Sequence, residues 1–218
     1  MKSHSKVAII GGGIMGVSLL YHLTKEGWND IVLIEKGELT SGSTWHAAGQ
    51  CPHFVGSYNS AKIHNYSNKL YQELEKETGQ STGWHGCGSI RLALKEEDLN
   101  WFHYVKGILD NVGSPAEFIT KEKILDLHPF LKIEDVLGGL HTPEDGYTDP
   151  TSTTNAMAIA ARKAGAEIYR HNRVIEITKL ISGEWELNTE KGKIICEHVV
   201  NAAGSFGIEV GAMVGLSN

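Results

Sequence analysis

KVAIIGGGIMGVSLLYHLTKEGWNDIVLIEK, residues 6–36, is the stretch that decides the fold of this 218-residue chain. Its first apolar run, residues 7–10, is short enough for a buried parallel strand. A helical pattern follows, and its inward face carries Val17, Leu20 and Tyr21. Gly27 stops that helix, and a second apolar run at residues 31–34 predicts the next strand. The stretch therefore predicts a strand–helix–strand unit.

Three glycines at the spacing G-x-G-x-x-G join the first strand to the helix: Gly11, Gly13 and Gly16. The first allows a sharp turn, the second lets a pyrophosphate approach the backbone, and the third lets the helix lie close on the strand. The free N–H groups and the positive dipole end of the helix then face the phosphates. Glu35, about twenty residues further on, can accept hydrogen bonds from ribose hydroxyls and would repel a 2′-phosphate. The combination predicts dinucleotide binding and disfavours an NADP-type ligand.

The composition is that of an ordinary globular protein, with 41% hydrophobic and 21% charged residues. The net charge of −6 argues against a nucleic-acid surface and against a polybasic membrane patch. No apolar run approaches the roughly twenty residues that a membrane helix needs. The first residues show neither a secretory signal nor a transit segment. We therefore expect a cytoplasmic protein with no membrane span and no nucleic-acid partner.

The cysteines favour a reducing compartment. Three occur, widely spaced and without a C-x-x-C motif: Cys51, Cys87 and Cys196. This number and spacing indicate free thiols rather than a disulfide framework. Cys51-x-His53 and His85-x-Cys87 together offer two thiols and two imidazoles, but a spacing of one residue is unusual for zinc. Loop residues near a cofactor are the simpler interpretation, and we predict no metal site.

Beyond residue 50 the pattern predicts a mixed segment and then a return to the first sheet. In the mixed segment we expect helices at 60–78, 95–111 and 120–128 and strands at 88–94, 117–119 and 136–141. The first of these helices has apolar positions at Ile63, Tyr66, Leu70 and Leu74. The return comprises a helix at 150–164, strands at 167–169, 173–179, 184–189, 193–196 and 198–201, and a last helix from Ser205. Turns with Gly183 and Gly192 fit a β-meander.

This order predicts an α/β fold: a Rossmann-like nucleotide-binding domain with a β-meander, interrupted by part of a mixed α+β domain. We assign residues 1–85 and 148–218 to the two parts of the nucleotide-binding domain. Residues 86–147 are assigned to a partial substrate domain.

The loop TSGSTWHAAGQ, residues 40–50, resembles the dimethylglycine dehydrogenase and sarcosine dehydrogenase family, within the D-amino-acid-oxidase-like flavoproteins. The likeness continues through GGGIMGVSLLYHL, IVLIEK, GSIRLA, DGYTDP, ARKAGAEI and VVNAAG, in the family's order. The resemblance implies an FAD-binding domain of the GR2/D-amino-acid-oxidase type, with FAD rather than NAD as cofactor. It also implies a covalent bond from His46 to the methyl group of the flavin ring system. A neutral imidazole nitrogen is a suitable nucleophile for that bond.

The resemblance places further cofactor contacts position by position. The phosphate turn comprises Gly11, Gly13, Ile14, Met15 and Gly16, and the ribose is contacted by Glu35 and Lys36. The flavin edge is wrapped by Gly42, Ser43, Thr44, Trp45, His46, Ala47, Ala48, Gly49 and Gln50. The adenine lies against the strand backbone at Val174, and the cofactor passes close to Ala202, Ala203, Gly204 and Phe206. Phe206 stands where the family tends to carry tryptophan.

The implied reaction is oxidation of a carbon–nitrogen bond in a small N-methylated amino acid, similar to dimethylglycine or sarcosine. A hydride passes from the N-methyl carbon to the flavin. In the family, electrons continue to an electron-transfer flavoprotein, and a later domain handles tetrahydrofolate. Family members extend far beyond the length of this chain. We therefore expect a fragment whose folate domain and catalytic residues lie beyond residue 218, and we name no general base.

Three alternatives stay open. An amine oxidase of the same fold would reduce oxygen directly and release peroxide. An NAD-binding dehydrogenase is disfavoured because the WHAAG and NAAG segments have no role in it. A non-catalytic remnant or regulatory subunit would keep only the nucleotide module. Among single residues, His85 and Tyr147 could face a substrate, whereas Asp149 is most simply the N-cap of the next helix.

Overall fold

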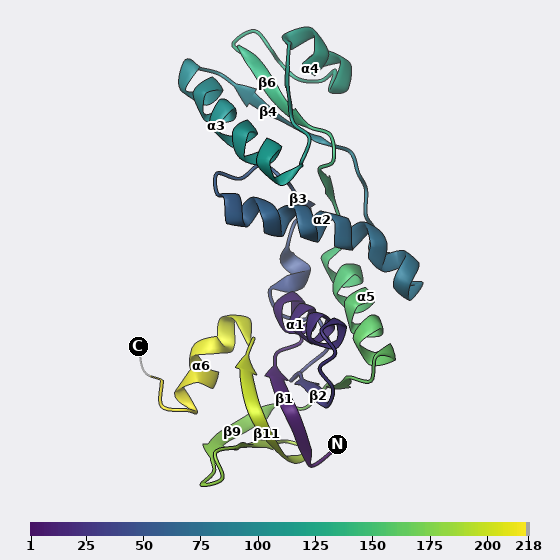
Figure 1. Cartoon of the computed structure of the whole chain (residues 1–218), viewed down its shortest axis with the longest axis vertical. Coiled ribbons are helices and arrows are strands. Elements are labelled where there is room, and N and C mark those ends of the chain that lie inside the picture. Colours follow the sequence, from purple (N-terminus) through teal and green to yellow (C-terminus); the bar gives the residue numbers. More distant parts are fainter. Residues whose placement is uncertain (217–218) are drawn as a thin grey trace. The chain divides into compact units, whose positions relative to one another are not determined.

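The computed structural model describes residues 1–216, which form two compact units; Figure 1 labels their elements. Unit 1 comprises Met1–Ala48, Leu74–Thr82 and Asp149–Asn218, and unit 2 comprises Gly49–Glu73 and Gly83–Thr148. Residues 49–73 thus pack with the second unit. The division into domains at 1–85, 86–147 and 148–218 stays a prediction, and its last two residues lie outside the described ones.

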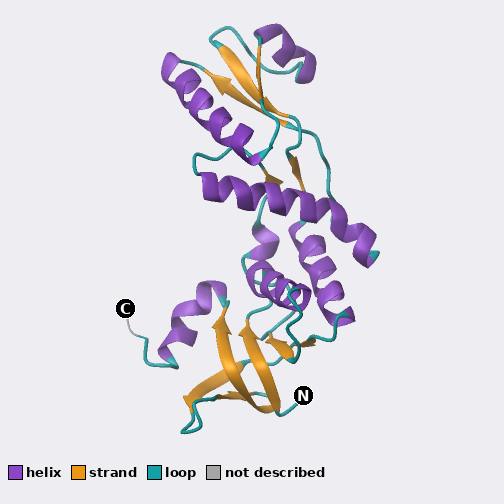
Figure 2. Cartoon of the chain, in the orientation of Figure 1, coloured by secondary structure: helices purple, strands orange, loops and turns teal. Residues whose placement is uncertain are grey.

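Unit 1 is built on a six-stranded sheet, whose strands are among the orange arrows of Figure 2. Its strands are β1 (His4–Ile10), β2 (Ile31–Ile34), β8 (Glu167–Tyr169), β9 (Val174–Lys179), β10 (Trp185–Thr189) and β11 (Gly192–Asn201). The spatial order is β8-β2-β1-β11-β10-β9. The pairs from β8 to β11 are parallel, and β11, β10 and β9 pair antiparallel. The predicted α/β class, parallel core and meander are confirmed.

Strand β11 corrects the prediction of two short strands at 193–196 and 198–201, because it is one strand of 10 residues. It pairs antiparallel with β10 from Gly192 to Cys196, and it pairs parallel with β1 from Ile195 to Asn201. Exposed Glu197 interrupts the apolar run. A single outward side chain does not end a strand, since successive side chains point to opposite faces.

Helix α1 (Ile14–Lys25) covers one face of this sheet, and α5 (Pro150–Lys163) packs against α1. The buried side of α1 carries the predicted Val17, Leu20 and Tyr21, together with Gly16. Helix α5 begins where predicted, and the carboxylate of Asp149 accepts a hydrogen bond from the backbone N–H of Ser152 at 2.6 Å. Asp149 is therefore the N-cap. Small buried side chains along α5, Ala156, Ala160 and Ala161 among them, allow close packing.

On the opposite face, β1 and β2 share a core with the meander strands of the same sheet and with α6 (Gly207–Ala212). The buried residues of this core are Ala8, Ile10, Val32, Ile34, Val174, Ile177, Leu187, Ile194, Cys196 and Val210. All four residues of β2 are buried, which is the pattern expected of a parallel strand covered on both faces.

Unit 2 contains a three-stranded antiparallel sheet in the order β4-β6-β5. Its elements are β4 (Ser89–Ala93), α3 (Glu96–Val112), β5 (Glu117–Ile119), α4 (Lys121–Leu127) and β6 (Gly138–Thr142). All five were predicted, with shifts of one or two residues at most ends. A smaller ladder pairs β3 (Gln50–Cys51) with β7 (Gly146–Tyr147). The inward side of α3 carries the predicted Phe102, Val105 and Leu109.

Helix α2 (Tyr58–Thr78) confirms the predicted helix but corrects its inward face. Ile63 and Tyr66 are 64% and 53% exposed, whereas Ala61 and Asn68 are buried. Leu74 is fully buried and Leu70 is half-buried, as their spacing predicted. The apolar spacing therefore predicted the buried side only in the C-terminal half of α2. Asn68 can be buried because its amide donates a hydrogen bond to the backbone oxygen of Cys51 at 2.9 Å.

Two short 3₁₀ helices complete the described chain, η1 (Thr44–His46) and η2 (Gly204–Phe206). No helix within residues 1–216 is long and apolar enough to cross a membrane.

Replacing Gly16 by Ala should destabilise unit 1, because a Cβ there would lie 2.0 Å from the carbonyl oxygen of Gly11. We expect the free energy of unfolding to fall by about 3 kcal/mol, which is high for an overpacked site, because the contacted atom belongs to the backbone and cannot move aside easily. Gly107→Ala is the matched control, because a Cβ at that position in α3 meets no atom within 4 Å. The control should stabilise by about 0.5–1 kcal/mol. Urea unfolding measures both, and two shifts of the same sign would contradict the contact.

Candidate functional site

The predicted phosphate turn joins β1 to α1, and close backbone contacts explain its glycines. Gly11 has a φ of +117°, and a Cβ on it would lie 2.3 Å from the carbonyl oxygen of Ala202. Gly16 holds the helix against Gly11. A Cβ on Gly13 would lie 3.0 Å from the Oγ1 atom of Thr44. The first and third glycines therefore have the packing roles expected of them, and the second lies beside a hydroxyl group.

The N-terminus of α1 can receive an anion. The backbone N–H of Ile14 donates to the Oγ1 atom of Thr44 at 3.0 Å, and Met15 is 75% exposed. The other first-turn N–H groups of a helix have no acceptor within it and carry the positive end of its dipole. The first turn of α1 holds no acidic side chain. This is the arrangement that binds phosphate at helix N-termini.

Glu35 lies immediately after β2 and is almost completely buried, with 9% of its surface exposed. One carboxylate oxygen accepts from the backbone N–H of Gly12 at 2.6 Å, and the other accepts from that of Gly37 at 2.7 Å. These bonds link the carboxylate directly to the glycine turn. Each oxygen keeps a further lone pair that can accept from a hydroxyl group.

The loop at residues 42–49 contains the predicted anchor His46. Thr44 is buried, whereas Trp45 and His46 are exposed and their ring centres lie 3.8 Å apart. The Nδ1 atom of His46 lies 3.1 Å from the carbonyl oxygen of Gly42. Because a carbonyl oxygen can only accept, Nδ1 carries the hydrogen and Nε2 of the neutral ring keeps a lone pair. The remaining predicted residues here are Ser43, Ala47 and Ala48, which are exposed, and Gly49, with a φ of +72°. Gln50 begins β3 in unit 2.

The end of β11 lies beside the end of β1, because the backbone N–H of Ala202 donates to the carbonyl oxygen of Ile10 at 2.8 Å. Ala203 packs on the core of unit 1, and Gly204 begins η2. The ammonium group of Lys36 lies 3.0 Å from the centre of the Phe206 ring, a cation–π contact. Two predicted cofactor residues from distant parts of the sequence therefore touch each other.

The side chain of Val174 is buried in the core of unit 1. The backbone two residues earlier, at Asn172, donates to the carbonyl oxygen of Glu35 at 2.9 Å. Asn172 is fully buried and accepts from the backbone N–H of Lys191 at 2.9 Å. Sequence reasoning missed Asn172, because a single buried polar residue in a turn leaves no periodic signal.

These contacts gather the glycine turn, Glu35, Thr44 and Ala202 at the carboxyl ends of β1, β2 and β11. That edge is where open α/β sheets bind nucleotides. The residues present fit a dinucleotide, since a helix N-terminus without acidic side chains in its first turn lies beside a buried carboxylate with further lone pairs.

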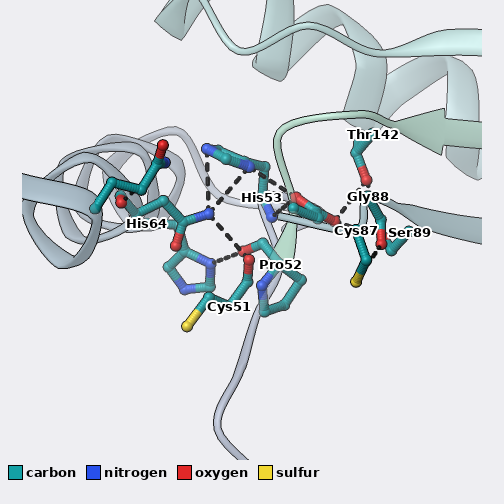
Figure 3. A network of polar contacts seen from close by, with 11 residues as sticks. Cys51, Pro52, His53, His64, Cys87, Gly88, Ser89 and Thr142 are labelled. Carbon is teal, nitrogen blue, oxygen red and sulfur yellow. Dashed lines mark hydrogen bonds and ion pairs between the residues drawn. The ribbon is translucent and has the colours of Figure 1, made fainter. Parts of the chain in front are cut away.

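Unit 2 contains a buried polar network centred on Asp145, which the sequence did not predict. One carboxylate oxygen accepts from the backbone N and the Nδ1 atom of His53, both at 2.7 Å. The other accepts from the hydroxyls of Ser89 and Thr142, both at 2.5 Å; Figure 3 shows the network. Burial by itself raises the pKa of Asp145, but the hydrogen bonds from His53, Ser89 and Thr142 outweigh burial and hold that pKa below its ordinary value.

Asn68 of α2 packs against the ring of His53. Its Nδ2 atom donates to the carbonyl oxygen of Cys51 at 2.9 Å and lies 3.2 Å from the Nδ1 atom and 3.4 Å from the Nε2 atom of His53. These contacts join α2 to the segment that follows β3.

The two pairs considered for zinc, Cys51 with His53 and His85 with Cys87, have other contacts. Within residues 1–216, no three His, Cys, Asp or Glu side chains are placed to hold a metal ion. The thiol of Cys51 donates to the carbonyl oxygen of Gly49 at 3.3 Å. Burial, and after it the charge of Asp145, raises the pKa of Cys51 to about 11. A protonated thiol is a poor metal ligand.

Fold and site together define a dinucleotide-binding α/β protein of the flavoprotein class. The chain belongs to the FAD dependent oxidoreductase family, whose sequence model matches residues 6–218.

Similar proteins narrow this assignment. The chain is 44% identical over 217 residues to "Dimethylglycine dehydrogenase, mitochondrial" of Rattus norvegicus, covering 100% of this chain and 25% of the relative. It is 40% identical over 211 residues to "Pyruvate dehydrogenase phosphatase regulatory subunit, mitochondrial" of Mus musculus, covering 97% of this chain and 24% of that relative. The solved structure of L-proline dehydrogenase from P. horikoshii aligns with a TM-score of 0.91 and 28% identity, covering 100% of this chain and 57% of that one.

The resemblance inferred from the TSGSTWHAAGQ loop is thereby confirmed at the level of the family. The chain spans about a quarter of the length of the curated relatives it matches. Both relatives are named as mitochondrial proteins, so the cytoplasmic location stays a prediction.

Replacing Asp145 by Asn should destabilise unit 2 by about 3 kcal/mol, because it removes the charged acceptor of a buried hydrogen-bond network and leaves donors unsatisfied. Asp110→Asn is the matched control. Its carboxylate is 55% exposed and pairs with Lys106 on the same helix, so it should cost less than about 0.5 kcal/mol. Urea unfolding compares the two variants, and equal losses would contradict the assigned network.

The same variant should show a characteristic pH dependence. The pKa of Asp145 lies below its ordinary value of 3.8, so its contribution to stability is fully present above that value and is lost as pH falls through the folded-state pKa. The stability difference between wild type and Asp145→Asn should therefore hold between about pH 5 and pH 7 and shrink below about pH 4. A stability difference that stays constant down to about pH 3 would contradict the lowered pKa of Asp145.

The three thiols should differ in reactivity. Cys87 is exposed, whereas burial raises the pKa of both Cys51 and Cys196 to about 11. With a pKa of about 11, only about 0.1% of each of these two thiols is in the reactive thiolate form at pH 8. Iodoacetamide should therefore label Cys87 in the folded protein and the other two only in urea, as read by peptide mass spectrometry. Labelling of folded Cys51 as fast as Cys87 would be inconsistent with its burial.

Proposed function

We propose that this chain is the flavin-binding part of an enzyme that oxidises the carbon–nitrogen bond of a small N-methylated amino acid. The observation that carries the proposal is the 44% identity to dimethylglycine dehydrogenase across the whole chain. The proposal applies the substrate class of that relative to this chain. Electron transfer to a separate flavoprotein is part of the same proposal.

The chain's own residues would bind and orient FAD. The N-terminus of α1 would receive the pyrophosphate, and the free lone pairs of Glu35 would accept hydrogen bonds from the ribose hydroxyls. Lys36, whose ammonium group contacts the Phe206 ring, would contact the ribose together with Glu35. The adenine would lie against the backbone near Val174, and the loop from Gly42 to Gln50 would hold the flavin end. When bound, FAD supplies the hydride acceptor, which no side chain can provide.

His46 is the residue that would join the flavin covalently. Its ring is exposed, and the bond from Nδ1 to Gly42 together with the contact to Trp45 restricts its orientation. Nε2, which is not engaged by Gly42, is the ring nitrogen that would carry the covalent link to the flavin. A histidine held in one tautomer by a backbone carbonyl is suited to this role.

Flavin retention in acid tests the link. Wild-type chain, loaded with FAD and precipitated with acid, should keep flavin fluorescence in the pellet and on a denaturing gel, and His46→Ala should lose it. His4→Ala, which changes another exposed histidine of unit 1, is the control and should keep it. Flavin that washes out of the wild type would contradict the covalent bond. It would leave non-covalent binding, measured separately by gel filtration, unaffected.

A second candidate is a regulatory, non-catalytic role, which the 40% identity to a phosphatase regulatory subunit favours. The two candidates differ in the response of the bound flavin to an amine. Anaerobic addition of dimethylglycine or sarcosine should bleach the flavin absorbance if the chain is catalytic and leave it unchanged if it is regulatory. Peroxide formation in air would favour an oxygen-using oxidase over a dehydrogenase.

A further inference from the structure

Three exposed side chains of unit 2 share one face of a small antiparallel ladder. Gln50 of β3 pairs with Tyr147 of β7, and Tyr147 pairs on its other side with His85. Directly paired residues of adjacent strands project their side chains to the same face. We call these three residues, Gln50, His85 and Tyr147, the ladder face.

Backbone hydrogen bonds define both pairs. His85 and Tyr147 exchange two bonds, at 2.8 and 3.1 Å. The bond from Thr148 to Gly49, at 2.9 Å, lies one residue beyond the pair of Gln50 and Tyr147, so that pair is of the non-hydrogen-bonded type, in which side chains lie closer together. The rings of His85 and Tyr147 have centres 5.2 Å apart, with their planes inclined by 38°. Tyr147 is 47% exposed. The ladder face therefore offers two neighbouring aromatic rings and one amide.

The ladder beneath these side chains is tightly packed. A Cβ on Gly146 would lie 2.5 Å from the carbonyl oxygen of His85 and 2.8 Å from the ring of Trp84, so only glycine permits this approach of the strands. The residue before it is Asp145, whose buried network ties the ladder to Ser89 and Thr142 (Figure 3). Exposed rings on a backbone held in this way lose little conformational freedom when they bind a ligand.

A buried carboxylate lies next to the ladder in the chain. Asp145 precedes Gly146 and accepts four hydrogen bonds, which hold its pKa below the ordinary value and keep the group negatively charged. That charge acts on Cys51, the neighbour of Gln50, since it contributes to the raised pKa of the Cys51 thiol. Aromatic rings backed by negative charge attract cations, and methylated ammonium groups are their best-known ligands.

We propose that the ladder face binds the methylated amino group of a small N-methylated amino acid, with Tyr147 and His85 contacting the methyl groups. The amide of Gln50 and the hydroxyl of Tyr147 provide hydrogen-bond donors for the ligand's carboxylate. This inference rests on the proposed function for its substrate class. It assigns substrate binding to residues of unit 2, of which Gln50 also belongs to the predicted flavin loop.

Calorimetric titration of the full chain tests the assignment with two probes of equal shape. Trimethylglycine carries a quaternary ammonium group and cannot be oxidised by hydride loss to an iminium, because its nitrogen has no lone pair. 3,3-Dimethylbutanoate replaces that nitrogen by carbon and is uncharged there. Wild type should bind the first probe about 5-fold to 30-fold more tightly than the second, the range expected of a cation–π contact. Tyr147→Leu should abolish this preference.

Tyr147→Phe is the matched variant, because it keeps the ring and should keep the preference, and His85→Ala should reduce it. Circular dichroism is the folding control, and only variants whose spectrum matches that of the wild type are compared. Equal binding of both probes by wild type, no binding of trimethylglycine, or a preference that survives Tyr147→Leu would each overturn the assignment. The titration needs no flavin, so failure of FAD binding would count against the proposed function and not against the ladder face.

Discussion

Three backbone segments meet at the glycine turn without room for a Cβ atom, and the architecture of unit 1 follows from that contact. The carbonyl oxygen of Ala202 approaches Gly11, and the carbonyl oxygen of Gly11 approaches Gly16. The ends of β1 and β11 and the start of α1 are thereby brought together. The first-turn N–H groups of α1 consequently lie beside the carboxylate of Glu35, which bonds the turn itself. Geometry that packs the sheet also leaves a place for an anion.

Unit 2 depends on a different interaction, in which one buried carboxylate accepts hydrogen bonds from donors on several segments. Asp145 accepts hydrogen bonds from the segment after β3, from β4 and from the end of β6. Burying a charge is unfavourable unless hydrogen bonds replace its hydration, and four donors do so here. These hydrogen bonds hold the pKa of Asp145 below its ordinary value, so the carboxylate stays negatively charged. A network that serves packing therefore also places a negative charge next to the ladder in the chain.

Local chemistry explains why most elements could be predicted. Asp149 caps α5, Thr120 caps α4, and Gly27 follows α1 with a φ of +77°, and each signal lies within a few residues of the feature it predicts. For α2 the prediction was wrong at Ile63 and Tyr66 but correct at Leu74, because apolar spacing alone does not say which turns of a helix meet the core. The split of β11 was wrong because Glu197 interrupts the apolar run, while pairing with β1 and β10 continues through it.

The sequence by itself determined the strand–helix–strand unit, the glycine turn with its acidic partner Glu35, and the family, because these depend on neighbouring residues at short spacing. Only the tertiary structure decided that Lys36 contacts Phe206, that Asp145 is the centre of a buried network, and that Gln50, His85 and Tyr147 lie side by side. Such contacts join residues far apart in the chain. Their formation depends on strand register and on how polar groups are satisfied in the folded interior, which short-range patterns do not encode.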